Sequence, residues 1–449
     1  MARLFGTDGV RGLANVDLTA PLALELGEAA ARLTIQGRPA SGHKPKAIIG
    51  RDTRISGEFL DHALAAGLAS AGMDVVRVGV VTTPTVAHLT ASSSVDLGVM
   101  ISASHNPMPD NGIKFFAHGG YKLPDQVEDQ IQELLNTPWD RPTGAAVGEV
   151  EYDDDWAEKS YIEHLMTSLG TDLHGLRIAV DCANGGASFL APEAFRQAGA
   201  DAVVINAAPD GRNINDKAGS THPEQLQALT VASEADFGVA YDGDADRCLA
   251  VDRHGNLVDG DKIMGALAVH MRDEGQLAKD TLVVTVMSNL GLILAMQEAG
   301  IQTVQTGVGD RYVLEAMLEG GYSLGGEQSG HIIAKKYATT GDGILSSLLL
   351  ARMVKESGRD LADLTSFIKR LPQTLINVGG VDRSRANTDP VVAEAVAAAE
   401  AVLGNTGRVL LRPSGTEPLV RVMVEAATQA QADGVASRLA DVVKESLSL

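Results

Sequence analysis

The chain has 449 residues, which is too long for one compact domain and predicts about three or four. Its formal net charge of −21 argues against a nucleic-acid partner, because binding the phosphate backbone needs a basic patch. A small anionic substrate stays open, since a pocket can be locally basic on an acidic protein. There is no apolar signal-peptide core and no run of about 18 apolar residues, so we expect a cytoplasmic protein without a membrane partner.

The predicted elements alternate between strand and helix over most of the chain, which is typical of α/β layers. Strands are expected at 46–52, 74–81 and 96–104, with a helix at 57–71. Similar alternation starts again near residue 173 and near residue 259. The last stretch differs, with three strands, helices at 390–403 and 429–447, and the pattern of an antiparallel sheet.

We therefore expect an α/β fold of four domains. Three are similar α/β domains with mixed sheets, and the fourth is a smaller α+β domain at the C-terminus. The predicted domains are 1–155, 156–256, 257–370 and 371–449.

The first loop with chemical potential is "ISASHNPMPDNGIKFF" at 101–116. It follows an apolar strand, and α/β proteins place ligand groups at the carboxyl ends of strands. Ser104 beside His105 offers a hydroxyl nucleophile, and Lys114 lies ten residues further on. Taken alone, the loop is equally well read as a polar turn with an incidental serine.

The second loop, "AYDGDADRCLAVD" at 240–252, carries the carboxylates Asp242, Asp244 and Asp246. Their alternation predicts that they share one side of an extended segment. Oxygen-rich clusters suit hard cations such as Mg²⁺, and three close carboxylates would otherwise repel one another. Arg247 could pair with a phosphate or a carboxylate. The competing interpretation is a solvated acidic turn.

The third loop, "GGEQSGHI" at 325–332, combines glycines with Glu327, Ser329 and His331. Glu327 and Ser329 alternate, so both could face one pocket and bind sugar hydroxyls. His331 could act as a general acid or base. A glycine-rich hairpin without a ligand fits this segment about equally well.

The fourth loop is "LRPSGTEPLVR" at 411–421. Two guanidinium groups and two hydroxyls surround a glycine, which is the donor set that binds phosphate. The residues are Arg412, Ser414, Gly415, Thr416 and Arg421. The alternative is a hairpin turn with exposed arginines.

Together the loops offer a nucleophilic hydroxyl, a cation site, a hydroxyl-binding loop and a phosphate anchor. A hydroxyl beside Mg²⁺ indicates phosphoryl transfer, with Ser104 carrying the group. A separate anchor indicates that the substrate has a phosphate that does not react in that step, as a phosphosugar can.

These motifs, in this order, resemble the α-D-phosphohexomutase superfamily, and within it the bacterial phosphoglucosamine mutases. The matching segments are "FGTDGVRG", "GRDTRISG", "ISASHNP", "DGDADR", "GEQSGH" and "RPSGTEP". Ala245 stands where that family often has glycine, a departure that costs little if its φ is negative.

The resemblance implies four domains around a central cleft and Ser104 carried as phosphoserine. It implies Mg²⁺ bound by Asp242, Asp244, Asp246 and an oxygen of phospho-Ser104. It also implies sugar contacts from Glu327 and Ser329 and phosphate contacts from the fourth loop. The implied reaction interconverts glucosamine 6-phosphate and glucosamine 1-phosphate through a 1,6-bisphosphate, toward UDP-N-acetylglucosamine and the cell wall. Glucosamine 1,6-bisphosphate or glucose 1,6-bisphosphate is the implied activator, and a homodimer the implied assembly.

A proton must leave the attacking sugar hydroxyl. The candidates to take it are Lys114, His331 and His105, with Arg11 and Arg51 stabilising charge. Lys114 would need a depressed pKa, which neighbouring arginines could supply. The sequence does not rank these residues.

Three other functions remain. The nearest is a phosphomannomutase or phosphoglucomutase of the same superfamily, which shares the chemistry. A phosphomonoesterase would hydrolyse phospho-Ser104 with water, but such enzymes usually have more metal ligands. A phosphosugar-binding regulator without catalysis would not need intact serine and metal loops.

Overall fold

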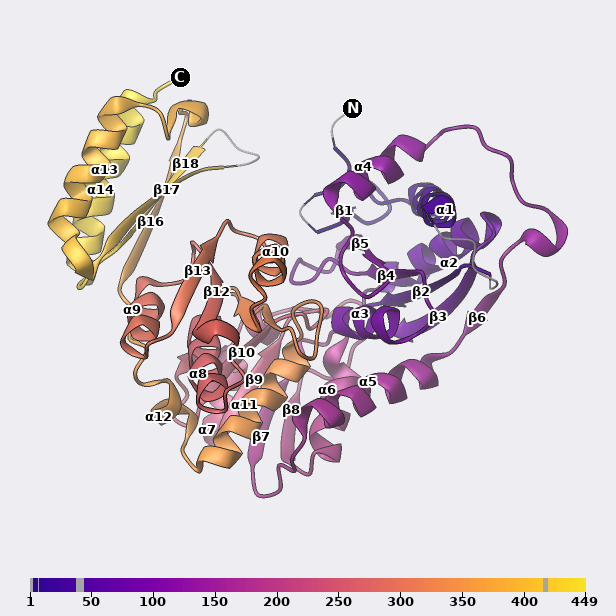
Figure 1. Cartoon of the computed structure of the whole chain (residues 1–449), viewed down its shortest axis with the longest axis horizontal. Coiled ribbons are helices and arrows are strands. Elements are labelled where there is room, and N and C mark those ends of the chain that lie inside the picture. Colours follow the sequence, from indigo (N-terminus) through magenta and orange to yellow (C-terminus); the bar gives the residue numbers. More distant parts are fainter. Residues whose placement is uncertain (1–2, 7, 38–43, 415–418) are drawn as a thin grey trace. The chain divides into compact units, whose positions relative to one another are not determined.

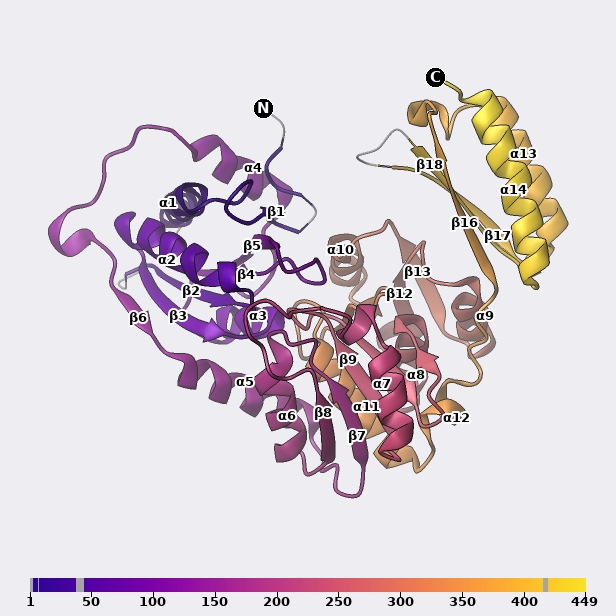
Figure 2. The same ribbon diagram turned by 180° about the vertical axis from the view of Figure 1, so that it is seen from behind.

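The computed structural model describes residues 3–6, 8–37, 44–414 and 419–449. They divide into two compact units, each discontinuous in sequence. The first comprises Met1–Met287 and Ile301–Ser366, and the second comprises Ser288–Gly300 and Phe367–Leu449. Figure 1 labels the elements, and Figure 2 shows them from behind. Within the described ranges, no helix is both long and apolar enough to cross a membrane.

The first sheet of the larger unit has the strand order β1-β5-β4-β2-β3-β6. Its strands are β1 (Val10–Leu13), β2 (Lys46–Arg51), β3 (Asp74–Val80), β4 (Leu97–Ile101), β5 (Asp110–Ala117) and β6 (Val150–Tyr152). The sheet is mixed, because β5 runs antiparallel to β1 and β4 while β2 is parallel to β3 and β4. Its helices are α1 (Ala20–Gly37), α2 (Ile55–Ser70), α3 (Thr83–Ser92) and α4 (Asp125–Leu134).

Helices α1 and α2 pack closely because each has a glycine at the contact. A Cβ atom on Gly67 would lie 2.2 Å from the carbonyl oxygen of Leu24, and one on Gly27 would lie 2.7 Å from that of Leu64. The predicted strands at 46–52, 74–81 and 96–104 and the predicted helix at 57–71 are confirmed, with ends that differ by a few residues.

The second sheet has the order β11-β10-β9-β7-β8 and follows α5 (Asp154–Leu169) in the chain. Its strands are β7 (Arg177–Asp181), β8 (Asp201–Ile205), β9 (Phe237–Tyr241), β10 (Cys248–Asp252) and β11 (Leu257–Val258). Strand β9 is parallel to β7 and antiparallel to β10. The helices are α6 (Ala187–Gln197) and α7 (Glu224–Ala232).

The third sheet has the order β13-β12-β14-β15, with only β15 antiparallel to its neighbour. Its strands are β12 (Thr281–Thr285), β13 (Gln302–Thr306), β14 (Leu324–Gly326) and β15 (Ile332–Ala334). The associated helices are α8 (Gly260–Asp273), α10 (Asp310–Gly320), α11 (Gly343–Ser357) and α12 (Leu361–Thr365). Three α/β sheets are thus present, as predicted.

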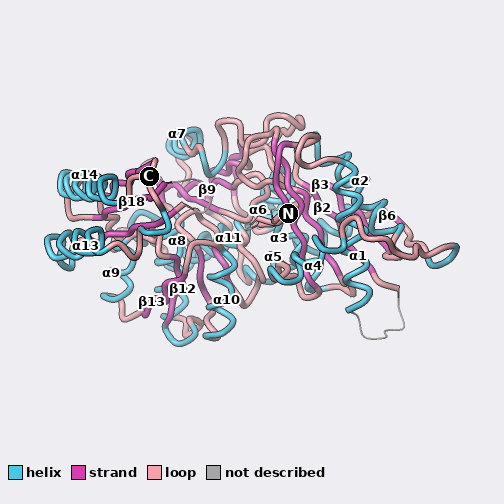
Figure 3. The backbone as a smooth tube through the Cα atoms, turned by 90° about the horizontal axis from the view of Figure 1, so that it is seen from above, coloured by secondary structure: helices cyan, strands magenta, loops and turns pink. Residues whose placement is uncertain are grey.

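The second unit is the predicted small α+β domain. Strands β16 (Gln373–Gly379), β18 (Leu419–Glu425) and β17 (Arg408–Pro413) form an antiparallel sheet in that order. Helices α13 (Pro390–Leu403) and α14 (Gln429–Ser446) lie side by side (Figure 3). Helix α9 (Leu290–Glu298) belongs to this unit as well. The buried carboxylate of Glu425 binds the N-terminus of α9. It accepts hydrogen bonds from Asn289 Nδ2 at 3.0 Å and from the backbone N–H of Leu290 at 2.9 Å.

Candidate active site

Ser104 lies in the loop between β4 and β5, and its side chain is buried. Its backbone N–H donates to Ser102 Oγ at 2.9 Å, and Ser102 in turn donates to Asp52 Oδ2 at 2.6 Å. The φ of Ser104 is +52°, in the left-handed region that few non-glycine residues adopt. Such conformations are held by the surrounding structure and often occur at functional sites.

Arg54 is the residue that holds this loop, and sequence reasoning missed it. Its buried guanidinium forms an ion pair with Asp52 at 2.9 Å. It also donates to the backbone carbonyls of Ser104, Asn106 and Pro107 at 3.0, 2.8 and 2.6 Å. Arginine suits this task because its planar fork carries five donors. Nothing local in the motif "GRDTRISG" shows that Arg54 reaches a loop 50 residues away.

The three predicted carboxylates converge beside the serine. Asp242, Asp244 and Asp246 are buried, and each offers an oxygen within 4.8 Å of the others. Ser104 Oγ donates to Asp242 Oδ2 at 2.5 Å, across 138 residues of sequence. The prediction of an extended segment is wrong, however. The loop is a turn in which the N–H of Ala245 donates to the carbonyl of Asp242 at 3.1 Å.

The turn also gives Ala245 a φ of +55°. We expected alanine at this position to cost little stability provided that its φ was negative. The φ is positive, so that expectation fails. An L-residue with a side chain loses about 1–2 kcal/mol in the left-handed region, which explains the preference for glycine at such a position.

The electrostatics differ among the three carboxyls. Burial, followed by the charges of Asp246 and Asp244, raises the pKa of Asp242 well above its usual value. Burial would also raise the pKa of Asp244, but the ammonium of Lys114 and the hydroxyl of Thr83 lower it below its usual value. Lys114 Nζ donates to Asp244 Oδ2 at 2.7 Å and Thr83 Oγ1 donates at 2.6 Å.

The donor set fits a hard divalent cation. Oδ1 of Asp244 and Oδ1 of Asp246 are buried and accept no hydrogen bond from the residues that the structure describes. A buried acceptor without a partner costs about 1–3 kcal/mol, and a group of like charges adds repulsion. A cation bound by these oxygens would remove both costs, and Mg²⁺ prefers carboxylate oxygens.

Two of the three candidates for proton transfer lie close to the serine. Burial lowers the pKa of Lys114, but the carboxylates of Asp244, Asp8 and Asp246 outweigh it and raise that pKa to about 12. The expected depression by neighbouring arginines is therefore wrong in this arrangement. His105 differs: burial, then Arg247 and Arg11, lower its pKa to about 4, and its Nδ1 lies 3.4 Å from Ser104 Oγ.

The third candidate, His331, is buried on the hairpin between β14 and β15. Its Nε2 accepts a hydrogen bond from the N–H of Gly341 at 3.2 Å and lies 3.5 Å from Asp310 Oδ2. Its Nδ1 is buried and has no hydrogen-bond partner within the described part of the chain. One ring nitrogen therefore remains available for a ligand.

The predicted charge-stabilising arginines lie in different surroundings. Arg247 Nε is buried, 3.8 Å from Asp246 Oδ1, and no other described residue accepts a hydrogen bond from it, so it remains a candidate for an anionic ligand. Arg11 pairs with Asp8, the residue that also pairs with Lys114 at 2.9 Å. Arg51 is paired with Glu58 and lies 3.7 Å from Asp61, both on α2, so its charge-stabilising role stays a prediction.

The predicted sugar loop is joined to the metal loop. The N–H of Cys248 donates to the carbonyl of Gly330 at 3.0 Å. Gly330 has a φ of +91°, and a Cβ there would lie 2.2 Å from the carbonyl oxygen of Cys248. Ser329 Oγ has no hydrogen-bond partner in the ranges that the structure describes, and Glu327 Oε1 accepts from the N–H of Gly309 at 3.2 Å.

The predicted phosphate anchor belongs to the second unit, on β17 and β18. Arg412 and Arg421 are directly opposite each other in the antiparallel register. Burial and the charge of Arg421 both lower the pKa of Arg412. Like charges in such a pair are destabilising, so an anion bound there would relieve the repulsion. Ser414 is buried and its carbonyl accepts from Arg383 at 2.5 Å, while Gly415 and Thr416 lie outside the described residues.

Four family models match the chain in order. They are described as phosphoglucomutase/phosphomannomutase alpha/beta/alpha domains I, II and III and the C-terminal domain, at residues 2–140, 159–255, 259–371 and 375–442. The chain is 60% identical to a phosphoglucosamine mutase of Bifidobacterium animalis subsp. lactis, with 100% of each chain covered. It is 59% identical to one from Streptomyces coelicolor, with the same coverage.

Among solved structures, the chain is similar to a phosphoglucomutase/phosphomannomutase family protein from Burkholderia thailandensis. The TM-score is 0.80 at 26% identity, and the match covers 99% of this chain and 97% of that one.

Proposed function

The chain belongs to the phosphoglucomutase/phosphomannomutase family, and on that basis we propose that it acts as a phosphoglucosamine mutase. It interconverts glucosamine 6-phosphate and glucosamine 1-phosphate, and its product serves UDP-N-acetylglucosamine and cell-wall synthesis. Identity of about 60% to phosphoglucosamine mutases over the whole length favours this activity over the other phosphohexomutases. The observation that carries the chemistry is the hydroxyl of Ser104 hydrogen-bonded into the cluster of three aspartates.

Ser104 is the phosphoryl carrier in this proposal. Asp242, Asp244 and Asp246 would hold Mg²⁺ together with an oxygen of phospho-Ser104. This ligand set is supported by Asp244 Oδ1 and Asp246 Oδ1, the two buried oxygens that accept no hydrogen bond from the described residues. When bound, the cation supplies charge neutralisation for the transferring phosphoryl group.

In the first half-reaction, O1 of the sugar 6-phosphate attacks the phosphorus of phospho-Ser104. The P–O1 bond forms and the bond from phosphorus to Ser104 Oγ breaks. The sugar hydroxyl loses its proton, and Ser104 Oγ gains one to become a hydroxyl again. Lys114 holds positive charge beside Asp244 and can stabilise the departing serine oxygen, as its raised pKa favours. His105 and His331 are the candidates to accept the proton. The pKa of His105 is lowered to about 4, so its ring is neutral at neutral pH but is a weak base.

The second half-reaction needs the 1,6-bisphosphate intermediate to turn around, so that its 6-phosphate returns a phosphoryl group to Ser104. One anchor must therefore accept either phosphate. Arg412, Ser414, Gly415, Thr416 and Arg421 take this role in the proposal, and Glu327 and Ser329 bind the sugar hydroxyls. A second phosphate position of this kind distinguishes a mutase from a phosphomonoesterase.

Glucosamine 1,6-bisphosphate or glucose 1,6-bisphosphate would reload Ser104 after loss of its phosphoryl group. The expectation of a homodimer rests on resemblance to the family alone. Sedimentation of the purified chain would establish its oligomeric state.

The test combines intact mass, phosphopeptide mapping and turnover. Wild type should carry one phosphoryl group on Ser104, and Ser104→Ala should lose both the label and turnover while keeping its circular dichroism spectrum. Ser233→Ala is the matched control, because its hydroxyl only caps the end of α7 by donating to the carbonyl of Leu229. Near wild-type turnover by Ser104→Ala with added bisphosphate would refute the mechanism. Comparing kcat/KM for glucosamine 6-phosphate and glucose 6-phosphate tests the amino-sugar preference separately.

A further inference from the structure

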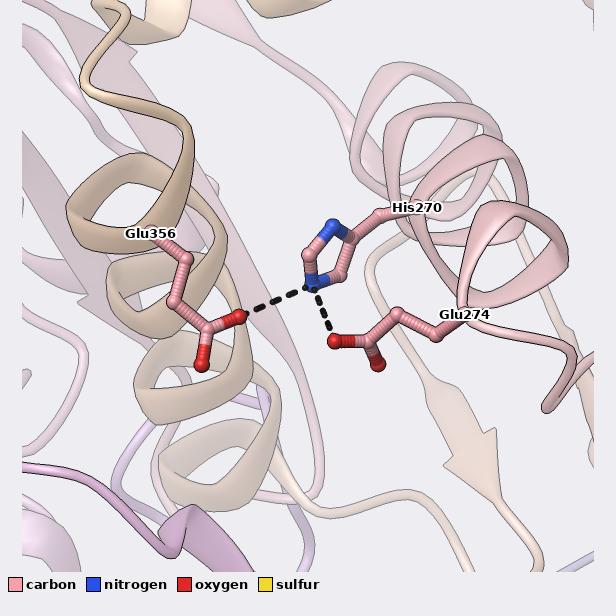
Figure 4. A group of neighbouring side chains, drawn as sticks. All are labelled: His270, Glu274 and Glu356. Atoms are coloured by element: carbon pink, nitrogen blue, oxygen red, sulfur yellow. Dashed lines mark ion pairs between the residues drawn. The ribbon is translucent and has the colours of Figure 1, made fainter.

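A second cluster of metal-ligating side chains lies between α8 and α11, and it shares no residue with the aspartate cluster. His270 is on the last turn of α8, Glu274 follows that helix by one residue, and Glu356 is on the last turn of α11. One atom of each lies within 4.8 Å of the others. Figure 4 shows both carboxylates pointing toward the same ring nitrogen of His270.

The imidazole nitrogen at the centre forms no hydrogen bond with the residues that the structure describes. His270 Nε2 is buried, and its nearest acidic atoms are Glu356 Oε2 at 3.5 Å and Glu274 Oε1 at 3.7 Å. Both distances are too long for an N–H···O hydrogen bond, whose usual range ends at about 3.2 Å.

The same distances suit two ligands of one metal ion. Ligand atoms about 2.1 Å from a tetrahedral zinc ion are about 3.4 Å apart, and wider coordination angles give slightly longer separations. One imidazole and two carboxylates form a donor set for Zn²⁺ and related divalent transition metals, and less so for Mg²⁺, which prefers oxygen alone.

Neighbouring side chains hold the two carboxylates in this orientation. Arg352 donates through Nε to Glu356 Oε1 at 2.8 Å and through a terminal nitrogen to Glu274 Oε1 at 3.1 Å. Gln276 donates to Glu274 Oε2 at 2.9 Å. Glu356 Oε2 is thus left facing the imidazole. Such outer hydrogen bonds orient ligand carboxylates in metal sites.

The charged groups of the cluster are the two carboxylates and the guanidinium of Arg352, and Lys336 lines the same hollow. The site also lies where two helices end, and helix C-termini carry partial negative charge. We propose that His270, Glu274 and Glu356 form a site for a divalent transition-metal ion of the Zn²⁺ class, which joins the C-terminal ends of α8 and α11.

The test measures metal stoichiometry in the full-length chain. The protein is stripped with EDTA, returned to excess Mg²⁺ to occupy the aspartate cluster, and dialysed against Zn²⁺ before elemental analysis. Wild type should bind one more Zn²⁺ per chain than His270→Gln or Glu356→Gln. His62→Gln is the matched control, because His62 also faces a glutamate four residues away on a helix, Glu58, and should bind as wild type does.

Two further measurements distinguish a built site from Zn²⁺ held at the aspartate cluster or loosely on the acidic surface. Co²⁺ should give a visible ligand-field absorption in wild type that is lost in both site variants. Zn²⁺ should raise the Tm of wild type by several degrees but leave that of Glu356→Gln unchanged. Equal Zn²⁺ stoichiometry in wild type and both site variants would overturn the proposal, as would loss of the ion in Asp246→Asn alone. Comparing the variants in EDTA shows whether they fold, and Glu274→Gln replaces any that does not.

Discussion

The guanidinium of Arg54 donates a 3.0 Å hydrogen bond to the backbone carbonyl of Ser104, and Asn215 Nδ2 donates to the same carbonyl at 2.9 Å. Arg54 immediately precedes α2, beside the first sheet. Asn215 lies in the loop that follows β8 of the second sheet. The proposed phosphoryl carrier is therefore positioned by side chains far from it in sequence. The position of its hydroxyl depends on contacts between two sheets.

Removing the Arg54 side chain should destabilise the protein and reduce turnover. Breaking a buried ion pair by deleting one partner costs about 3–5 kcal/mol, because the remaining charge stays buried. Arg54→Ala should lower the free energy of unfolding by about that amount in urea denaturation. Arg3→Ala is the control: Arg3 also pairs with acidic residues, but its side chain is 39% exposed, and its loss should cost less than about 1 kcal/mol. Equal losses in the two variants would contradict the buried role.

Arg412→Ala should raise the KM for the phosphosugar and leave the dependence on Mg²⁺ unchanged. A charge-assisted hydrogen bond contributes about 1.5–3 kcal/mol, so we expect an increase of about 10- to 100-fold. Arg385→Ala serves as the control in the same unit, since Arg385 already pairs with Asp389, the residue that precedes α13. A shift in the Mg²⁺ titration instead of KM would show that the anchor is assigned wrongly.

Stability should fall in acid partly through the stacked pair His88 and His164, whose ring centroids are 4.2 Å apart. Burial, then the charge of His164, lowers the pKa of His88 from 6.5 to about 4. A lowered histidine pKa means that the folded state binds fewer protons than the unfolded state between these values. The contribution of His88 to the free energy of unfolding is therefore fully present above pH 6.5 and is lost as the pH falls toward 4.

His88→Gln should reduce this acid-induced loss by about 2–3 kcal/mol relative to wild type. Unfolding free energies measured from pH 7 to pH 4 give the comparison, and effects of other groups cancel in the difference between the two proteins. His62→Gln, at an exposed position, should give a curve parallel to that of wild type. If the His88→Gln curve is parallel as well, the stacked pair does not cause the loss.

Ala245→Gly should change the free energy of unfolding by less than about 1 kcal/mol. Relief of the positive φ gains about 1–2 kcal/mol, which offsets the lost methyl burial of about 0.8 kcal/mol and the greater freedom of unfolded glycine. Ala240→Gly is the matched control, because Ala240 is equally buried but lies in the regular strand β9. It should cost at least about 1 kcal/mol. Similar losses at both positions would mean that residue 245 is not strained.

Much of the fold could be predicted because its signals are local. Strands β2 and β4 are visible in the sequence as short apolar runs. The helices at 390–403 and 429–447 are visible as periodic patterns, and each signal lies within a single segment. The four loops could be located for the same reason, since each joins polar groups to the end of an apolar run.

Long-range partners could not be predicted this way. Arg51 and Arg54 are three residues apart in one motif, yet one pairs with α2 and the other reaches the loop of Ser104. Which of them turns toward the serine is decided by tertiary packing. The pKa of Lys114 depends in the same way on Asp8 and Asp244, which lie 106 residues before it and 130 residues after it.

The left-handed backbone at Ser104 also restricts which hydroxyl residue can occupy the position. Threonine has the same nucleophilic group, but its β-branched side chain is poorly tolerated at a φ of +52°. We therefore expect threonine at residue 104 to strain this loop, even though it carries the same hydroxyl group as the proposed carrier. Backbone geometry thus favours serine over threonine at this position, apart from any phosphate chemistry.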